Sequence, residues 1–597
     1  MTSTAQSLLI LPFKNLSPSP EQEYLSDGLT EELIAALTTY DNIRVASRTS
    51  SFYFKNKVFS LEEIREKLNV THILEGSIRN IREQLRIIVH LTDAAEGFTI
   101  WSETFRLDYQ NLLEVQDEIV SRILRRFDTA ADPLNRLHAV PNNDVDAYND
   151  YLKGLYYFNK YSMDNLAKAA EWMQKAVRKQ PEFALAYATM STCYVALGGY
   201  IHPSYYPQSK TYALKAIALN DQLIEPLLSL SYVQLFYDRD WEGAAATIDR
   251  ALQLNIRSAP VHRAKGLLYL ATGRKTEAID AHVIATKYDP LNTIFINGLG
   301  IMFTNAYRFE EGIAEYERCL NIDDSFRPAV EGLGWLKSYE KKWEEAIAYF
   351  QSYQKMVGDP LKGWYGLGYA YGKKGDKTKA KVILEKLFKR KEQQPDESLD
   401  LDFAVVYLGL GQKDKTYAYL NSAIEKQHLI TIGYLASDPV FDELKDDDRY
   451  WELIRKLGLE NYMNASITST SSQLVLSLEG ETQEQLEILY NQFLYAQADG
   501  NYVKVVWKDG QKMKEHLLRA TLGNIHEQIK GPGIIQTHRS FLANLNNFSS
   551  ISRDGRQHIL TNESFQLAIP VSRSRTAQIR RLLTRSSQNG PIGHKED

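Results

Sequence analysis

Two arginine-containing segments near the C-terminus carry the clearest chemistry in the sequence. Thr537-His538-Arg539-Ser540 and Ser572-Arg573-Ser574-Arg575 both place arginine among hydroxyl side chains. A guanidinium group can donate two parallel hydrogen bonds to O6 and N7 of guanine, which gives ~1–3 kcal/mol of discrimination between bases. A hairpin pattern further upstream adds cations along which a phosphate backbone could run, at Lys504, Lys508, Lys512 and Lys514. These residue types predict contacts to nucleic acid.

The distribution of charge supports that prediction, although the average hides it. The chain of 597 residues has 70 Lys and Arg against 75 Asp and Glu, a formal net charge of -5. Residues 485–597 hold 15 of the cations and 9 of the acids, a net charge of +6. The remaining 484 residues hold 55 and 66, a net charge of -11. An acidic body joined to a basic end indicates a nucleic acid or another acidic partner.

Enzymatic and metal chemistry is poorly supported, and we predict no catalytic residue, no cofactor and no metal site. Ser26-Asp27-Gly28 and Arg48-Thr49-Ser50 could suggest phosphate contacts, but the Gly-rich spacing and the Lys of a phosphate loop are missing. Turns and helix caps explain both segments better. His72 and His90 have no carboxylate or Cys at ligand spacing, and packed histidines are the favoured interpretation.

The cysteines and the apolar runs bear on the compartment. Cys193 and Cys319 cannot form a disulfide framework, and both fall in helical patterns as packed thiols. No run approaches the ~18 apolar residues that span a bilayer. The N-terminus lacks a basic region before its short apolar stretch. We therefore expect a cytoplasmic protein with no membrane partner.

Small residues recur every 34 residues in the middle of the chain. One set follows Leu in most units, and a second lies twelve positions later: Gly266, Gly300, Gly334 and Gly368, then Ala244, Ala278, Gly312, Ala346 and Ala380. Small side chains at both places allow two helices of a hairpin to cross closely. The pattern resembles the tetratricopeptide repeat, which implies an α-helical solenoid over residues 145–460 with a groove for a protein or peptide partner. The alternative is a spacer that only joins two ends. Residues 437–457 are predicted to close the stack.

The amino-terminal segment alternates strand and helix patterns, which predicts an α/β domain over residues 1–130. Four motifs resemble the TolB-amino-terminal-like domain: Leu11-Pro12-Phe13-Lys14-Asn15-Leu16-Ser17, Tyr24 to Leu33, Arg48-Thr49-Ser50-Ser51-Phe52, and Leu74-Glu75-Gly76-Ser77-Ile78-Arg79. In bacteria this module often precedes tetratricopeptide repeats in regulators and signalling cyclases. The family supplies no agreed catalytic residues to carry over.

After a Ser/Thr-rich linker at residues 464–472, the hydrophobic period changes from helix-like to strand-like. Residues 473–586 are predicted to form a mostly-β domain, followed by a flexible tail at residues 587–597. Four motifs resemble the LytTR DNA-binding domain of bacterial response regulators: Leu494 to Val503, Thr521-Leu522, Thr537 to Leu545, and Ile569-Pro570-Val571-Ser572-Arg573.

The LytTR resemblance implies that loops, rather than a recognition helix, enter successive major grooves. Carried over by motif, the base-reaching candidates are Asn501, Arg539 and Arg573. The phosphate or supporting contacts are His538, Ser540, Lys504 and Arg575. Relatives often carry a phosphorylatable receiver domain, but its acidic pocket has no counterpart in this sequence.

The fold class expected is therefore multidomain α+β: an α/β domain, a tetratricopeptide solenoid and a LytTR-like domain. We predict a DNA-binding transcriptional regulator whose first two domains are a sensor or a protein-interaction module. It should bind double-stranded DNA at promoter repeats as a homodimer. The alternative is a repeat scaffold, or regulatory subunit of a signalling complex, whose basic tail binds an acidic partner.

Overall fold

The chain forms two compact units, Met1–Glu460 and Asn461–Asp597, which are described one at a time. The predicted linker and tail lie outside the described residues. The computed structural model describes residues 6–40, 43–82, 84–108, 112–127, 144–160, 162–358, 363–395, 397–426, 435–463, 475–481, 484–489, 492–509, 512–529, 534–555, 557–562, 565–576, 579–580 and 583.

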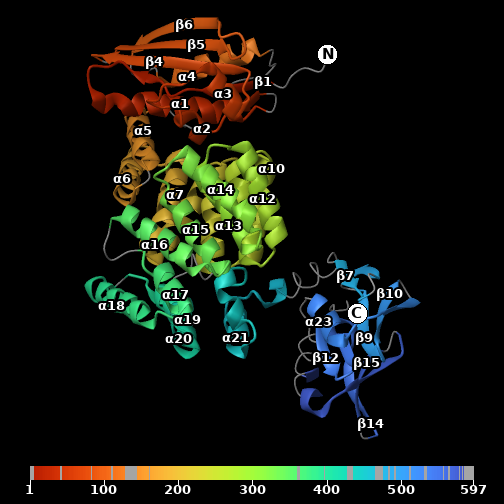
Figure 1. Ribbon diagram of the computed structural model, residues 1–597. Helices are drawn as coiled ribbons and strands as arrows, with labels where there is room; N and C mark the ends of the chain where they lie inside the picture. Colours follow the sequence, from red (N-terminus) through yellow and green to blue (C-terminus); the bar gives the residue numbers. More distant parts are fainter. Residues whose placement is uncertain are drawn as a thin grey trace, which may run out of the picture. The chain divides into compact units, whose positions relative to one another are not determined.

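The first unit begins with an α/β domain built on a six-stranded sheet (Figure 1). Strand β1 pairs in parallel with β3 and β4, while β4, β5 and β6 form an antiparallel meander and the short β2 pairs with β4. The strands are β1 (Gln6–Ile10), β2 (Lys14–Asn15), β3 (Ile43–Val45), β4 (His72–Ile81), β5 (Gln84–Asp93) and β6 (Thr99–Asp108).

Helices cover the two faces of this sheet unequally. Helices α1 (Glu23–Thr38) and α4 (Leu112–Arg126) pack on one face, where Leu33 and Ile123 join Ile87 in a continuous buried core. On the other face, α3 (Leu61–Leu68) covers the region of β1 and the start of β4. Alternate residues of β4, β5 and β6 on that second face remain exposed or half-buried. A further short helix of the domain, α2, spans Arg48–Phe52.

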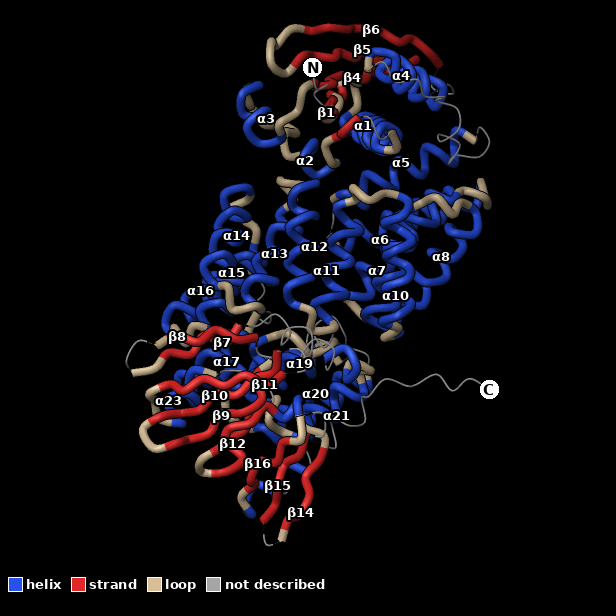
Figure 2. The backbone as a smooth tube through the Cα atoms, turned by 90° about the vertical axis from the view of Figure 1, so that its right-hand side faces the viewer, coloured by secondary structure: helices blue, strands red, loops and turns tan. Residues whose placement is uncertain are grey.

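The rest of the first unit is a stack of helical hairpins (Figures 1 and 2). The helices are α5 (Val145–Asn159), α6 (Met163–Lys179), α7 (Ala184–Tyr200), α8 (Tyr206–Leu219), α9 (Ile224–Val233), α10 (Trp241–Leu254), α11 (Ala259–Ala271), α12 (Lys275–Tyr288), α13 (Thr293–Asn305), α14 (Phe309–Ile322), α15 (Arg327–Tyr339), α16 (Trp343–Val357), α17 (Tyr365–Lys374), α18 (Lys377–Gln393), α19 (Asp400–Gly409) and α20 (Lys413–Glu425).

The small residues of the 34-residue pattern lie where helices cross. A Cβ added to Gly334 would lie 2.7 Å from the ring of Phe350, and one added to Gly300 would lie 2.7 Å from the ring of Tyr316. Ala346 and Ala380 are fully buried. The interpretation of the pattern as close helix crossings is confirmed.

A closing segment at residues 435–463 returns to earlier repeats. It contains a short 3₁₀ helix (Pro439–Leu444) and α21 (Asp448–Lys456). Tyr339 of α15 donates a hydrogen bond of 2.6 Å to Asp438, and Trp241 of α10 donates one of 2.9 Å to the carbonyl oxygen of Leu457. The segment therefore ties α10 to the second half of the stack.

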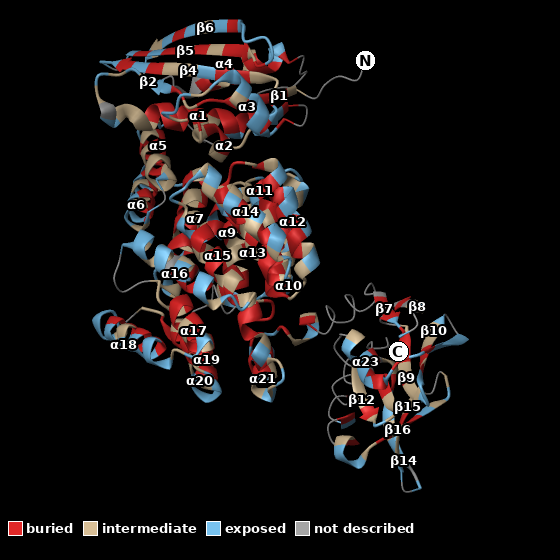
Figure 3. Ribbon diagram, viewed as in Figure 1, coloured by how far each residue is buried: buried red, intermediate tan, exposed pale blue. Residues whose placement is uncertain are grey.

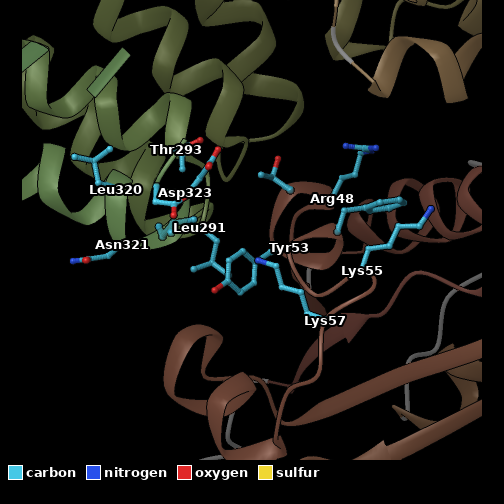
Figure 4. A pocket seen from close by; sticks show the side chains of 13 residues that line it. Arg48, Tyr53, Lys55, Lys57, Leu291, Thr293, Leu320, Asn321 and Asp323 are labelled. Carbon is cyan, nitrogen blue, oxygen red and sulfur yellow. The ribbon is translucent and has the colours of Figure 1, made fainter. Parts of the chain in front are cut away.

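The α/β domain and the repeats share a buried contact. The carboxylate of Asp289, at the end of α12, accepts hydrogen bonds from Ser47 and from Ser50 (3.0 Å) at the start of α2, and from Asn292 (2.8 Å). Burial raises the pKa of Asp289. Beside this contact lies a pocket of about 670 Å³ (Figure 4), lined on one side by Arg48, Thr49, Phe52, Tyr53, Lys55 and Lys57 and on the other by Leu291, Thr293, Leu320, Asn321, Ile322, Asp323 and Asp324.

The second unit consists mainly of strands (Figure 2). Its largest sheet has the order β11-β10-β9-β13-β12, and separate sheets contain β14-β15-β16 and β7-β8. The elements are β7 (Val475–Glu479), β8 (Gln485–Leu489), β9 (Phe493–Asp499), β10 (Tyr502–Asp509), β11 (Lys512–Leu518), α23 (Leu522–Gln528), β12 (Ile534–His538), β13 (Phe541–Asn544), β14 (Ser550–Asp554), β15 (Gln557–Asn562) and β16 (Leu567–Val571).

Two clusters of buried residues stabilise this second unit. Figure 3 colours the buried parts of its strands red. Phe493, Val505 and Ile525 belong to one cluster, between the large sheet and α23. Leu560 and Ile569 belong to the other, which lies under the three-stranded sheet. The expected mostly-β fold of the C-terminal domain is confirmed. Across the described residues of both units, no helix has the length and apolar character needed to cross a membrane.

Candidate nucleic-acid interface

The pairing of β9 with β13 brings two turns to the same edge of the large sheet. The two strands are antiparallel, with Phe541 opposite Gln497 and Leu542 opposite Ala496. The C-terminal end of β9 therefore lies beside the N-terminal end of β13. The first end continues into the β9–β10 turn and the second follows the β12–β13 turn.

Backbone hydrogen bonds fix these turns and add a third segment. The N–H of Ala498 donates to the carbonyl oxygen of Ser540 at 2.9 Å, joining the end of β9 to the β12–β13 turn. The N–H of Ser572 donates to the carbonyl oxygen of Thr537, also at 2.9 Å, joining the end of β16 to the end of β12. We call the edge formed by residues 499–502, 537–540 and 572–575 the binding edge.

The three residues predicted to reach bases all lie exposed on the binding edge. Asn501 follows Gly500, whose φ of +60° suits the tight β9–β10 turn, and Arg539 lies in the β12–β13 turn. Arg573 begins a short 3₁₀ helix (Arg573–Arg575) after β16. Among the side chains that the structure describes, none bonds to the guanidinium of Arg539 or Arg573. Both remain available to a ligand.

The supporting candidates on this edge have internal contacts. The guanidinium of Arg575 donates to the carbonyl oxygen of Gln536 and, at 3.5 Å, to its side-chain oxygen. The N–H of Ser540 donates to Nδ1 of His538 at 3.4 Å, while the His538 ring stands edge-on to Phe541. Arg575 thus holds the segment after β16 against β12, and His538 contributes to the β12–β13 turn.

The lysines lie farther from the edge and are partly paired. Lys504 on β10 forms an ion pair with Glu515 of the neighbouring strand β11 at 3.3 Å. Lys508 donates a hydrogen bond of 2.7 Å to Asn547, and burial lowers the pKa of its ammonium group. Lys514 pairs with Asp509 at 2.5 Å.

Sequence reasoning missed two contributors to this edge. Gln536 anchors Arg575, and the signal for it was absent because β12 and the residues after β16 are far apart in the chain. Tyr502 lies next to Asn501 with 44% of its surface exposed. An aromatic residue directly after a Gly-Asn turn was the signal that could have identified it.

Among the described residues considered for enzymatic or metal chemistry, the two cysteines are buried and His72 is half-buried. Cys193 and Cys319 are fully buried, and burial raises the pKa of each thiol to about 12. His72 packs edge-on against Phe127, and burial lowers its pKa. No group of three or more His, Cys, Asp or Glu side chains suited to a metal occurs among the described residues.

Comparison with protein families identifies the segments one by one. Residues 484–584 match the LytTr DNA-binding domain. Residues 4–122 match the second domain of HilA/YgeH-like transcriptional regulators, over the segment whose motifs resemble the TolB-amino-terminal-like domain. Residues 234–290 and 361–394 match tetratricopeptide repeats.

Individual relatives are more distant. A curated protein of Rhizobium meliloti (strain 1021), named "Putative adenylate cyclase 3", is 28% identical over 198 residues, which is 33% of each chain. The chain thus spans about a third of the length of that relative.

Two solved tetratricopeptide structures are similar in part. A tetratricopeptide repeat protein from Parabacteroides merdae is 15% identical with a TM-score of 0.30, covering 52% of this chain and 98% of that one. A thermophilic tetratricopeptide repeat protein in Thermus thermophilus is 19% identical with a TM-score of 0.27, covering 30% and 92%. The matched families together support a transcriptional regulator that combines a LytTR DNA-binding domain with tetratricopeptide repeats, a repeat type that suggests a protein-interaction module.

Proposed function

We propose that the binding edge reads DNA sequence through Asn501, Arg539 and Arg573. The observation that supports this most strongly is that three segments distant in the sequence converge on one edge, each with an exposed polar side chain. Arginine can pair in bidentate fashion with guanine, and asparagine with adenine. His538, Ser540 and Arg575 hold the turns or contact phosphates, and Lys504 contacts the backbone beside them.

Two copies of the chain bind one promoter, one on each of two repeated half-sites. A single binding edge presents three short segments, and pairing of half-sites would multiply its affinity through a high effective concentration. The α/β domain and the repeats act as the sensor or partner-binding part. We place the protein in the cytoplasm, where it has access to DNA, and assign it no catalytic step of its own.

The test is a mobility-shift comparison on DNA selected by the wild-type chain. Arg539→Ala and Arg573→Ala should each lose about 10- to 100-fold of the preference for the selected site over a scrambled site, since each base pair contacted is worth ~1–3 kcal/mol. Two chains per duplex should be bound when two half-sites are present, as measured by sedimentation.

Lys512→Ala is the matched control. Lys512 is exposed and begins β11, at the end of the sheet opposite to the binding edge. Removing its charge should weaken binding to both sequences alike, if at all, and should leave the preference unchanged. Undiminished preference in both arginine variants would refute the assignment of these residues.

A further inference from the structure

Three arginines stand side by side on the open face of the α/β domain's sheet. The register pairs Arg79 on β4 with Arg86 on β5, and Arg86 with Arg106 on β6. All three are exposed. Neighbouring strands are about 4.8 Å apart, so the three side chains form a row about 10 Å long. We call this row the arginine ladder.

The face on which the ladder lies is set by the alternation of the strands. Ile78, Ile87 and Phe105, each next to a ladder residue in sequence, point into the core shared with α1 and α4. The ladder residues therefore point away from that core, onto the face that α3 covers only near β1.

Among the described residues, the rows on either side of the ladder contain one carboxylate, Asp108, and it forms no ion pair with the ladder. The adjoining row contains Ser77, Ile88 and Thr104, extended by Lys14 of β2 opposite Ser77. On the other side, Asp108 accepts a hydrogen bond from Gln84. No ion pair to Arg79, Arg86 or Arg106 exists within the part of the chain that the structure describes.

Such a row is unfavourable for folding by itself. Like charges directly opposite one another across a sheet are destabilising. Three neighbouring arginines therefore do not contribute to the stability of the sheet. The ladder also lies within residues 1–484, whose net charge is -11. A row of one sign on an acidic body indicates a polyanionic ligand.

We propose that the arginine ladder, with Lys14, binds the phosphate backbone of duplex DNA outside the site read by the binding edge. This rests on the proposed function, because the LytTR domain supplies the DNA. The ladder lies on an open sheet face rather than in a pocket, which fits an extended backbone. Arginine suits phosphate because its planar fork can donate two hydrogen bonds to one group.

This contact does not depend on the DNA sequence, and it increases the affinity for DNA because it is made within a complex that already exists. Once the LytTR domain holds the DNA, any second contact by the same chain is intramolecular and adds affinity through effective concentration. The ladder should therefore matter only when the duplex extends beyond the selected site.

The experiment uses the whole chain and three duplexes: a short one with only the selected site, a long one with the same site and flanks, and a long one with a scrambled site. The test variant is Arg79→Gln, Arg86→Gln and Arg106→Gln together. The control carries Lys377→Gln, Lys381→Gln and Lys389→Gln, an equal loss of charge at exposed positions of α18. Binding is measured over a range of salt concentrations.

The wild-type chain and the control should bind the long duplexes on the order of tenfold more tightly than the ladder variant, and all should bind the short duplex equally. The ladder variant's salt slope on long DNA should be smaller in magnitude by about 2–3, at ~0.9 for each lost phosphate contact. Its unfolding temperature should be no lower than that of the wild type, because repulsion is removed.

Equal binding of the long duplexes by the wild type and the ladder variant would overturn the inference and leave an acidic protein surface as the occupant. A loss on the short duplex as great as on the long ones would overturn it too. Failure of the proposed function looks different: the wild type would not distinguish the selected from the scrambled long duplex, while the ladder's salt slope would persist on both.

Discussion

At the level of single residues, the arginines of the binding edge lie in two different environments. Arg539 and Arg573 are exposed, whereas Arg575 is half-buried and bonded to Gln536. Arg575 is therefore a positioning residue that fixes the start of the segment after β16 relative to β12. The sequence separated the two arginines only through the LytTR resemblance, which made Arg573 a base-reaching candidate and Arg575 a supporting one. The bond from Arg575 to Gln536 has no signal in the segment Ser572-Arg573-Ser574-Arg575 itself.

One imidazole in the repeats should make the fold sensitive to acid. His282 on α12 is fully buried against Gly266 and Gly298, and burial lowers its pKa to about 3. In the unfolded chain the same group titrates near its ordinary pKa of about 6.5. As the pH falls below 6.5 the unfolded state binds the proton and the folded state does not, so stability is lost from there down towards pH 3.

We expect His282→Gln to remove this part of the pH dependence. Between pH 7.5 and pH 5, the wild type should lose about 2 kcal/mol of unfolding free energy through this group, and the variant should not. Urea unfolding of the repeats, followed by tryptophan fluorescence at the two pH values, measures the difference. The exposed His526 provides the control, since His526→Gln should behave as the wild type does. An unaltered pH dependence in His282→Gln would contradict the prediction.

At the level of elements, the repeats depend on how closely two helices can cross. Gly334 on α15 faces Phe350 on α16, where an added Cβ would lie 2.7 Å from the ring. We expect Gly334→Ala to lower the stability of the repeats by about 1–3 kcal/mol through overpacking. Thermal unfolding followed by circular dichroism measures it.

A helical glycine with free space around it gives the control for Gly334. A Cβ added to Gly523 on α23 would approach nothing closer than 3.9 Å. There the change to Ala should raise stability slightly, by up to about 0.5–1 kcal/mol, because only the entropic disadvantage of glycine is removed. A Gly334→Ala variant more stable than the wild type would contradict the prediction, because it would show that α15 and α16 can move apart without a loss of stability.

Equivalent positions in successive repeats can have different functions, as Asp289 and Asp323 illustrate. They lie 34 residues apart, at the ends of α12 and α14. Asp289 is buried and accepts hydrogen bonds from the start of α2. Asp323 is exposed, and among the described residues its carboxylate bonds locally, to Ser325. One position of the repeat has thus become the contact with the α/β domain.

We expect Asp289→Asn to loosen α2 from the repeats. The carboxylate accepts each of these bonds, and Asn292 approaches one of its oxygens with an NH2 group. An amide NH2 in place of that oxygen would meet a donor and leave a buried group unsatisfied, at about 1–3 kcal/mol. Hydrogen exchange of residues 48–52 should become faster in this variant. Asp323→Asn is the matched control and should leave their exchange as in the wild type. Unchanged exchange in Asp289→Asn would show that other contacts are sufficient to hold α2 against the repeats.

At the level of the whole molecule, periodic features were predictable and long-range contacts were not. The recurrence of Gly266, Gly300 and Gly334 identified helix crossings, because spacing within one repeat determines that contact. The motifs around Asn501, Arg539 and Arg573 identified the candidate site but not its geometry. That geometry depends on strand register and on bonds such as Ser572 to Thr537, for which no local pattern exists.

Charge shows the same limit of sequence reasoning. The division into an acidic body and a basic end is visible by counting, and it favours DNA at the C-terminal unit. The arginine ladder is invisible to such a count, because Arg79, Arg86 and Arg106 come together only through the pairing of three strands. A local surface can therefore have the opposite sign to the segment that contains it.

The closing segment makes the stability of early repeats depend on the end of the stack. Trp241 at the start of α10 is nearly fully buried and donates to the carbonyl oxygen of Leu457, 216 residues later. We expect Trp241→Phe to keep the apolar contact but to leave that carbonyl without its donor, at about 1–3 kcal/mol. Hydrogen exchange of α21 should become faster, with DNA affinity unchanged.

The repeat itself supplies a control for Trp241. Trp343 starts α16 as Trp241 starts α10, three repeat lengths later in the sequence, and its ring packs against Tyr369. Trp343→Phe should therefore leave the exchange of α21 as in the wild type. Equal exchange rates of α21 in the two variants would contradict the prediction. The closing segment would then be held by its apolar contacts, without a contribution from the bond between Trp241 and Leu457.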